Sequence, residues 1–125
     1  MTTKSLRLFA PESYWNAIPA ERSAVCNGCG VAGWKGKLVP DTLWGLDISK
    51  ACDIHDWMYH HGVTESDRCE ADRVFLNNLI RIINNHGGVL AGLRRYRATT
   101  YYNSVHRFGG AAFWDDKNPS ETMSA

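Results

Sequence analysis

The chain has 125 residues, the length of a single domain with terminal segments. Hydrophobic residues make up 44% of it and charged residues 22%, a globular balance that excludes disordered and collagen-like chains. Fourteen Lys and Arg against thirteen Asp and Glu give a net charge of +1, too balanced for a dedicated nucleic-acid-binding protein, and no apolar run approaches the roughly 18 residues of a transmembrane helix.

Residues 1–25 form a mixed N-terminal segment, in which Pro11 and Pro19 are expected to interrupt regular structure. The start of this segment has too few consecutive apolar residues for a secretory signal. The four cysteines are nevertheless an even number in a small domain, which suggests two disulfides and an oxidising compartment. Localisation therefore stays open, with the cysteines favouring a secreted or otherwise exported protein.

Residues 26–40 are expected to form a loop rich in glycine, with the sequence Cys26-Asn27-Gly28-Cys29-Gly30-Val31-Ala32-Gly33 at its start. A glycine-rich backbone can turn several carbonyl oxygens inward, and calcium takes six to eight oxygen ligands. The segment therefore suggests a calcium loop. A plain surface turn or a Cys-x-x-Cys metal knuckle are the alternatives.

A first helix is predicted from about Asp41 or Asp47 to Gly62. Its apolar face contains His55, because the spacings of three and four place this residue in line with Ile48, Ala51, Cys52 and Tyr59. Asp56 follows about 100° around the helix, at the edge of that face. It can offer a carboxylate to calcium if the glycine-rich loop lies against the helix. Taken alone, His55 is better interpreted as a hydrogen-bonded core histidine.

A second helix is predicted to begin at a capping box, either Thr64–Asp67 or Ser66–Cys69, and to run to about His86. Asp72 lies on its apolar stripe with Leu76, Leu79 and Ile83. A buried carboxylate is costly without a partner, and a neutral His55 on the neighbouring helix suits it. Asp72 would fix the tautomer of His55 and leave its other ring nitrogen basic. The alternative is that Asp72 pairs with Arg68 or Arg73 at the surface. Asp72 lies on the apolar face of the helix, which does not suit such a surface pair.

A third helix is predicted from about Val89 to Phe108, closed by Gly109–Gly110. Residues 87–114 hold four arginines and no acidic residue, with tyrosines interleaved. Such a segment suits an anionic surface such as phospholipid headgroups, although a solvated helix face has the same composition. We single out Arg94 and Arg95 as candidates for this contact, with Trp34 in the loop as a second candidate region. The residues His60, His61, His86 and His106 are expected at the surface.

Three of these segments together resemble the phospholipase A2 superfamily. The run Cys52-Asp53-Ile54-His55-Asp56-Trp57-Met58-Tyr59 resembles its active-site helix, the loop at 29–33 resembles its calcium loop, and Asp72-Arg73 resembles the Asp-Arg pair that orients the catalytic histidine. The short spacing from His55 to Asp72 is similar to the compact bacterial, fungal and viral members. The resemblance covers roughly residues 26–80.

The resemblance implies an all-α fold, a small disulfide-stapled bundle of three main helices with an N-terminal glycine-rich calcium loop. It implies calcium-dependent hydrolysis of the sn-2 ester of glycerophospholipids, with His55 as general base, Asp72 orienting it and Tyr59 bonding Asp72; Tyr101 or Tyr102 could do likewise. Calcium would be held by the Asp56 side chain and the carbonyls of Gly28, Gly30 and Ala32, and the Gly30 N–H would also bind the oxyanion. The predicted disulfides are Cys29–Cys52 and, by elimination, Cys26–Cys69.

The expected organisation is an N-terminal segment 1–25, a phospholipase A2-like catalytic domain 26–114 and a loose polar tail 115–125. We expect a monomer that acts peripherally on a phospholipid membrane or micelle, with no nucleic-acid partner and no transmembrane segment.

Three alternatives remain. The departures from the family's loop at Gly28 and Ala32 favour a catalytically weak lipid- or protein-binding module of the same fold. A zinc interaction domain would use all four cysteines, but their spacing is poor for a zinc finger. A phosphohydrolase of the His-Asp type would need further metal ligands, for which only His60 and His61 lie nearby.

Overall fold

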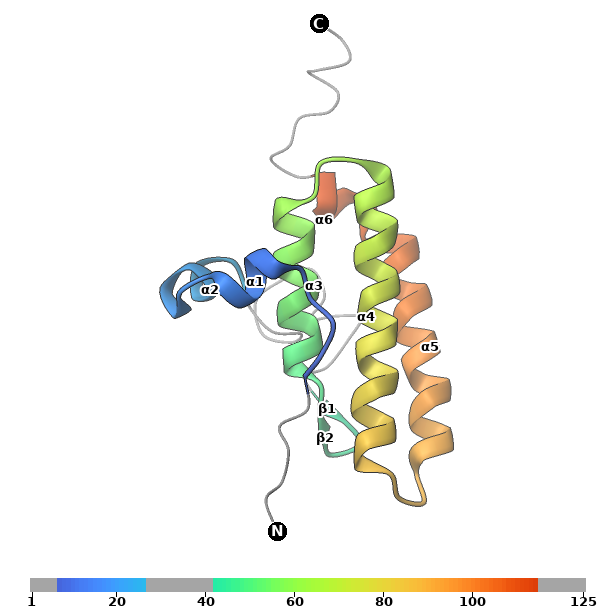
Figure 1. The fold of residues 1–125 in the computed structure, drawn as a ribbon. Helices are drawn as coiled ribbons and strands as arrows, with labels where there is room; N and C mark the ends of the chain where they lie inside the picture. Colours follow the sequence, from blue (N-terminus) through green and yellow to red (C-terminus); the bar gives the residue numbers. More distant parts are fainter. Residues whose placement is uncertain (1–6, 27–41, 115–125) are drawn as a thin grey trace, which may run out of the picture.

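The computed structural model describes residues 7–26 and 42–114. Its described part is mostly helical, and three long helices stand side by side as a bundle (Figure 1). These are α3 (Ser49–His61), α4 (Glu65–His86) and α5 (Ala91–Phe108), and α4 packs against both of the others. The predicted all-α class is confirmed, and the three main helices lie close to where the sequence placed them.

Short elements surround the bundle. Two helices, α1 (Glu12–Asn16) and α2 (Pro19–Val25), project to one side, and α6 (Gly110–Trp114) lies at the end where α3 meets α4 (Figure 1). At the other end, β1 (Thr42–Leu43) pairs antiparallel with β2 (Leu46–Asp47). The two prolines start helices rather than break them, since Pro11 precedes α1 and Pro19 is the first residue of α2. The predicted interruption is confirmed at the break between α1 and α2, but the sequence analysis did not predict that a helix would begin at each proline.

The start of α3 agrees with the later of the two predicted positions, near Asp47, and not with Asp41. The helix begins at Ser49, because residues 42–47 form the hairpin, whose turn places Trp44 at φ 48° and Gly45 at φ 84°. Asp47 accepts hydrogen bonds from the Ser49 backbone N–H at 2.9 Å and the Ser49 hydroxyl at 2.7 Å, which fixes the first turn. The helix ends before Gly62 as predicted.

Gly62 is required by packing. A Cβ atom at this position would lie 2.7 Å from Cε1 of Phe113, the fully buried residue of α6. The absence of a side chain therefore lets α6 close over the end of α3.

The predicted capping box at Thr64–Asp67 is confirmed at the start of α4. The Asp67 N–H donates to Oγ1 of Thr64 at 3.0 Å, and the Thr64 N–H donates to Oδ2 of Asp67 at 3.1 Å. The helix ends at Gly87 and Gly88, whose φ values of 68° and 91° lie in the left-handed region that glycine tolerates. This turn brings α5 back alongside α4.

The core fills the space between the three long helices. Its fully buried side chains come from α3, α4, α5 and the hairpin: Leu43, Ile48, Ile54, Phe75, Leu79, Ile83 and Val105. The α4 members recur at spacings of four; Leu79 and Ile83 belong to the apolar stripe predicted from the sequence, whereas Phe75 is fully buried and the predicted Leu76 is only partly buried. Because Asp72 belongs to the same stripe, the fold buries its carboxylate. No helix within residues 7–26 and 42–114 is both long and apolar enough to cross a bilayer.

The segment 7–11 lies across α3 and α4, and Asn78 of α4 holds it there (Figure 1). The Phe9 N–H donates to Oδ1 of Asn78 at 2.7 Å, and Nδ2 of Asn78 donates to the Phe9 carbonyl at 2.9 Å. Asn78 is fully buried and Phe9 is about half-exposed, so both bonds are partly shielded from water.

Asn78→Ala is therefore expected to lower the free energy of unfolding by about 2 kcal/mol, because two partly buried hydrogen bonds are lost and a cavity remains where the buried side chain was. Urea unfolding measures this. The neighbouring Asn77→Ala, at an exposed position on the same helix, is the control and should change stability by less than about 0.5 kcal/mol. Equal effects of the two substitutions would show that Asn78 does not anchor the segment.

The predicted Cys26–Cys69 disulfide is wrong, since both residues are thiols. They lie against different partners: Sγ of Cys26 donates to the Asp53 carbonyl of α3 at 3.1 Å, whereas Cys69 lies on α4 beside the Glu65 carboxylate, at 3.9 Å. Cys52 is buried in the core and disulfide-bonded. Its predicted partner, Cys29, lies outside the described residues, so the Cys29–Cys52 pairing stays a prediction.

Arg94 is not the surface residue that we expected. Its side chain is buried, and it braces the hairpin by donating from Nε to the Leu43 carbonyl at 3.0 Å and from Nη2 to the Trp44 carbonyl at 2.6 Å. A guanidinium held this way cannot contact a membrane, so the predicted interface role of Arg94 is wrong. Arg95 is exposed and bonds Asn84 at 2.9 Å. Trp34 lies outside the described residues.

Candidate active site

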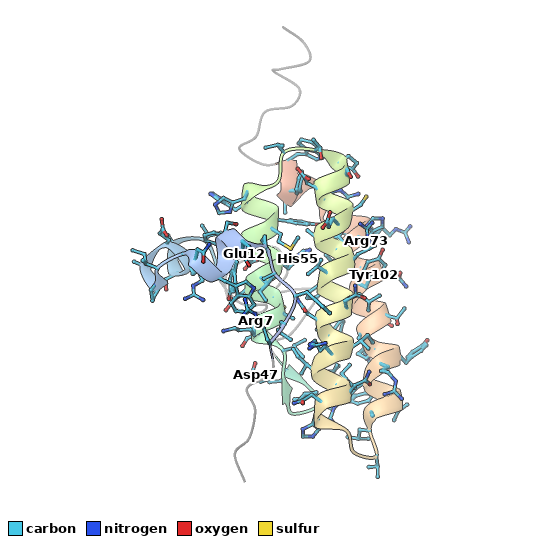
Figure 2. All side chains as sticks on the ribbon, in the orientation of Figure 1. Arg7, Glu12, Asp47, His55, Arg73 and Tyr102 are labelled. Carbon is cyan, nitrogen blue, oxygen red and sulfur yellow. The ribbon has the colours of Figure 1, made fainter. Side chains whose placement is uncertain are left out.

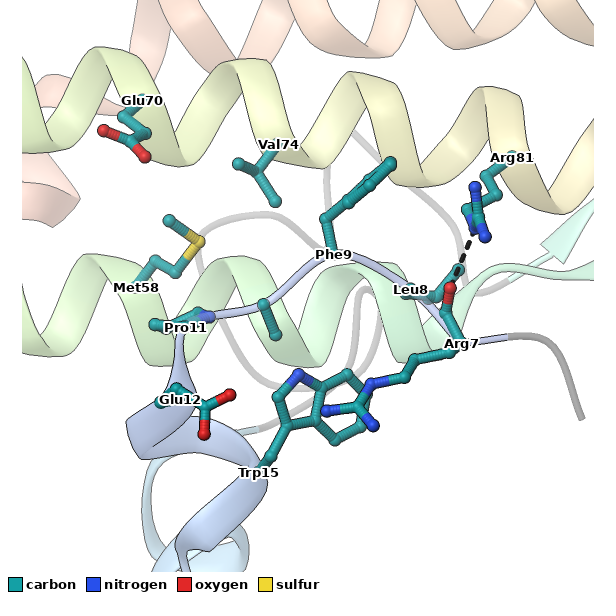
Figure 3. Close-up of a pocket in the computed structure, with 11 residues that line it drawn as sticks. Arg7, Leu8, Phe9, Pro11, Glu12, Trp15, Met58, Glu70, Val74 and Arg81 are labelled. Carbon is teal, nitrogen blue, oxygen red and sulfur yellow. Dashed lines mark hydrogen bonds between the residues drawn. The ribbon is translucent and has the colours of Figure 1, made fainter.

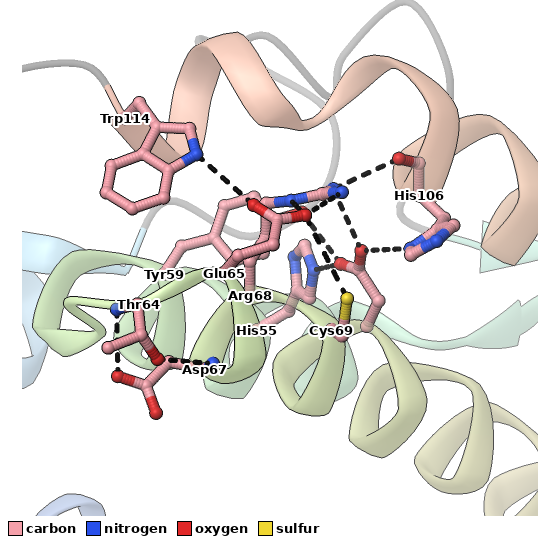
Figure 4. Close-up of polar contacts among 10 residues, drawn as sticks. His55, Tyr59, Thr64, Glu65, Asp67, Arg68, Cys69, His106 and Trp114 are labelled. Carbon is pink, nitrogen blue, oxygen red and sulfur yellow. Dashed lines mark hydrogen bonds and ion pairs between the residues drawn. The ribbon is translucent and has the colours of Figure 1, made fainter. Parts of the chain in front are cut away.

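The site is built around the carboxylate of Asp72, which is fully buried on α4. Nε2 of His55, from α3, lies 2.7 Å from Oδ1 of Asp72, and neither side chain is accessible to solvent (Figure 4). This pairing was predicted from helical periodicity and is confirmed. Arg73, one of the alternative partners, is exposed and points away from α3 (Figure 2).

Tyr59, one helical turn after His55, shares the same carboxylate oxygen. Its hydroxyl donates to Oδ1 of Asp72 at 2.7 Å, as the resemblance implied. Burial, followed by the negative charge of Asp72, raises the pKa of Tyr59 well above its usual range, so the phenol stays protonated. The rings of Tyr59 and Phe75 lie against the imidazole of His55, with centroids 4.1 and 4.9 Å away, and limit its rotation.

The second oxygen of Asp72 is held by groups that the sequence analysis did not place there. Nδ1 of His106, from α5, lies 2.9 Å from Oδ2, and Nη1 of Arg68 lies 3.4 Å from the same atom. His106 was expected at the surface. Its side chain is partly exposed, but the Nδ1 edge of the ring faces Asp72, so the expectation is wrong for that edge. A signal existed, because Ala98, Tyr102 and His106 follow one another at spacings of four along the side of α5 that faces α4.

Arg68 was considered as an alternative partner of Asp72 in place of His55. In the structure both residues contact the carboxylate. Glu65 binds the Arg68 guanidinium at 2.7 Å, and Nε1 of Trp114 from α6 donates to the other Glu65 oxygen at 3.3 Å (Figure 4). The hydrogen bond to Glu65 raises the pKa of Arg68 further above its already high value, so the charge is permanent. The tyrosines proposed for this side do not bond Asp72: Tyr102 stacks on the His106 ring, and Tyr101 packs against the core.

These contacts set the protonation of the site. Burial alone would raise the pKa of Asp72, but the hydrogen bond and charge of His55, with the bonds from Tyr59 and His106, hold it below its ordinary value. An ionised carboxylate only accepts hydrogen bonds, so His55 must carry its proton on Nε2. The lone pair of the neutral ring is then on Nδ1, which can take a proton while Asp72 stabilises the resulting imidazolium.

Asp56 follows His55 on α3 and is partly buried. Its carboxylate has the hard oxygen chemistry that calcium prefers, so it fits the proposed ligand set. The three carbonyl positions of that set, Gly28, Gly30 and Ala32, lie outside the described residues, and so does the predicted Gly30 oxyanion donor. Within the part of the chain that the structure describes, no cluster of three or more His, Cys, Asp or Glu side chains could hold a metal. The calcium site therefore stays a prediction.

A pocket of about 510 Å³ lies between the N-terminal segment and the outer side of α3 and α4 (Figure 3). Phe9, Trp15, Met58 and Val74 give it apolar walls, and Arg81 donates to the Arg7 carbonyl at 2.8 Å at one end. None of the residues that bond Asp72 lines it. The pocket is thus separate from the Asp72 cluster, and the sequence analysis did not anticipate it.

Comparison with known proteins finds no matching family model, no matching curated protein and no matching solved structure.

Proposed function

We propose that this protein is a calcium-dependent phospholipase A2, which hydrolyses the sn-2 ester of glycerophospholipids to a lysophospholipid and a fatty acid. The observation that carries the proposal is the buried cluster of His55, Asp72 and Tyr59, with both Nε2 of His55 and the Tyr59 hydroxyl 2.7 Å from one oxygen of Asp72. A histidine with a fixed tautomer and a carboxylate behind it is suited to general-base catalysis. The resemblance of residues 26–80 to the superfamily supplies the substrate class.

In this mechanism, Nδ1 of His55 removes a proton from a water molecule, which attacks the ester carbonyl without a covalent enzyme intermediate. Asp72 is ionised and buried, so it stabilises the positive charge that forms on His55 more strongly than it would in water. Tyr59 keeps Asp72 oriented toward His55. The same proton can then be passed from His55 to the leaving alcohol.

The Asp56 carboxylate and the carbonyls of Gly28, Gly30 and Ala32 would hold calcium beside this base. Bound there, calcium would polarise the ester carbonyl and stabilise the developing oxyanion. The proposed N–H donor of Gly30 would assist at the same oxygen.

Two alternatives have less support. A weak binding module of the same fold does not require a histidine whose tautomer is fixed by a buried, ionised carboxylate, an arrangement that is concentrated at catalytic sites. A four-cysteine zinc domain is disfavoured because Cys52 is fully buried in the apolar core and disulfide-bonded.

The proposal includes peripheral binding to phospholipid. The outward side of α5 exposes Leu93, Tyr96 and Arg97, which share a face at spacings of three and four. The Arg97 guanidinium lies 5.6 Å from the ring of Trp44, an exposed residue of the hairpin turn. With Arg94 buried, Arg95 and Arg97 are the cations of this region that can reach anionic headgroups, each contributing about 1 kcal/mol at low salt.

The test is release of fatty acid from an sn-2-labelled phospholipid, in calcium and in a chelator. We expect hydrolysis only in calcium. Asp56→Asn should weaken calcium binding, measured by calorimetry, by about tenfold or more, because the site loses its only charged ligand. Glu70→Gln, an exposed carboxylate on α4, is the control and should leave binding unchanged. Unaltered calcium affinity in Asp56→Asn would exclude the proposed site, and calcium-independent release would exclude the proposed metal role.

A further inference from the structure

The carboxylate of Asp72 is held from two sides by different helices. His55 and Tyr59, both from α3, share Oδ1, whereas Nδ1 of His106 from α5 lies 2.9 Å from Oδ2. Asp72 therefore lies between two imidazole rings. The inner ring of His55 has no exposed side-chain surface, and the outer ring of His106 is 40% exposed.

The direction of the outer hydrogen bond follows from the charge of Asp72. Because the ionised carboxylate only accepts, His106 must donate from Nδ1. A proton can be added at or removed from its Nε2 without breaking this bond. His106 is thus a donor to Asp72 in both its neutral and its charged form.

Three contacts fix the position of His106. The Tyr102 ring stacks on it with centroids 5.6 Å apart and an interplanar angle of 8°. Nη1 of Arg68 donates to the His106 carbonyl at 3.0 Å and lies 3.4 Å from Oδ2 of Asp72. The backbone and the ring of His106 are therefore both tied to α4 beside Asp72. At 2.9 Å, His106 is the shorter of the two donors on Oδ2.

We propose that His106 is a positioning residue for the hydrolysis, and that its Nδ1–H holds the Asp72 carboxylate in the orientation that presents Oδ1 to His55. This inference rests on the proposed function. Without the His106 donor, Oδ2 of Asp72 would keep only the longer contact with Nη1 of Arg68, at 3.4 Å, and the carboxylate would be freer to rotate about its Cβ–Cγ bond. His106 acts on His55 only through Asp72 and does not touch the substrate.

Two substitutions separate the hydrogen bond from the bulk of the ring. In His106→Asn the amide nitrogen can occupy the place of Nδ1 and keep the donor, whereas His106→Leu removes the donor. We expect His106→Leu to lower kcat by about tenfold with KM within about twofold, and His106→Asn to stay within about threefold of the parent. The same two substitutions at His86, an exposed histidine at the end of α4, serve as controls and should change nothing.

A second readout does not depend on activity. The Nε2 proton of His55, hydrogen-bonded to buried Asp72, should give a downfield proton resonance by NMR. We expect this resonance to move or broaden in His106→Leu and to be kept in His106→Asn. Equal behaviour of the two variants, in kcat or in this resonance, would overturn the positioning role. If the parent protein shows no hydrolysis, the proposed enzyme activity fails, and the resonance alone decides whether His106 orders the pair.

Discussion

Replacing His55 by Gln is expected to lower the rate of sn-2 hydrolysis by about 10³-fold while the protein remains folded. The loss follows because a glutamine amide cannot accept a proton, and a general base supplies about 10²–10⁴-fold of rate. The fold should survive, because the side-chain nitrogen of Gln can still donate to Oδ1 of Asp72 in place of Nε2 of His55. Single-turnover rates on an sn-2-labelled phospholipid measure the effect.

His86→Gln is the matched control, since His86 is exposed at the end of α4. It should retain full activity. Circular dichroism and urea unfolding should give similar curves for both variants and the parent. A folded His55→Gln protein that still turns over at near the parental rate would remove His55 from the mechanism.

Asp72→Asn is expected to reduce both activity and stability. The neutral amide cannot stabilise the positive charge on His55, so hydrolysis should fall by at least about 10²-fold. The carboxylate of Asp72 accepts from four donors, on His55, Tyr59, Arg68 and His106. The NH₂ group of Asn is itself a donor, so it would face at least one of these groups without a hydrogen bond. Breaking such a buried set should lower the free energy of unfolding by about 3 kcal/mol at neutral pH. Glu70→Gln is the control for both measurements.

The stability loss should depend on pH in a defined direction. The pKa of Asp72 is lower in the folded protein than its ordinary value of 3.8, so the folded state holds this proton less tightly than the unfolded chain. The stabilisation is therefore present above that value and is lost as the pH falls through the folded pKa. Other carboxylates titrate in both proteins and cancel in the comparison. Urea unfolding should show the gap between parent and Asp72→Asn narrowing below about pH 4; a constant gap would contradict the assignment.

Helical periodicity was sufficient to predict the centre of the site. The spacings around His55 and Asp72 place both on apolar faces, and a buried carboxylate needs a donor. Two capping boxes were predicted for the start of α4, and the structure confirms Thr64–Asp67, whose hydrogen bonds join residues three apart, rather than Ser66–Cys69.

The features that were missed depend on contacts between distant residues. Arg94 binds the carbonyls of Leu43 and Trp44, which are 51 and 50 residues away. It lies four residues before Ala98, on the side of α5 that faces α4, but this spacing alone does not indicate which groups a buried guanidinium would bind. His106 reaches Asp72 across 34 residues in the same way.

The two N-terminal prolines are a local case. Pro11 and Pro19 were interpreted as interruptions because proline is excluded from the interior of a helix. In the structure they stand where α1 and α2 begin, a position that proline favours.

Asp72 lies on α4, and three of its donors lie 13, 17 and 34 residues from it along the chain: Tyr59 and His55 on α3, and His106 on α5. None of these helices can form the base alone, and α4 by itself would expose a solvated carboxylate. A newly made or partly unfolded chain would therefore contain every residue of the proposed machinery and remain chemically inert. Under the proposed function, catalytic competence would arrive only together with complete tertiary structure.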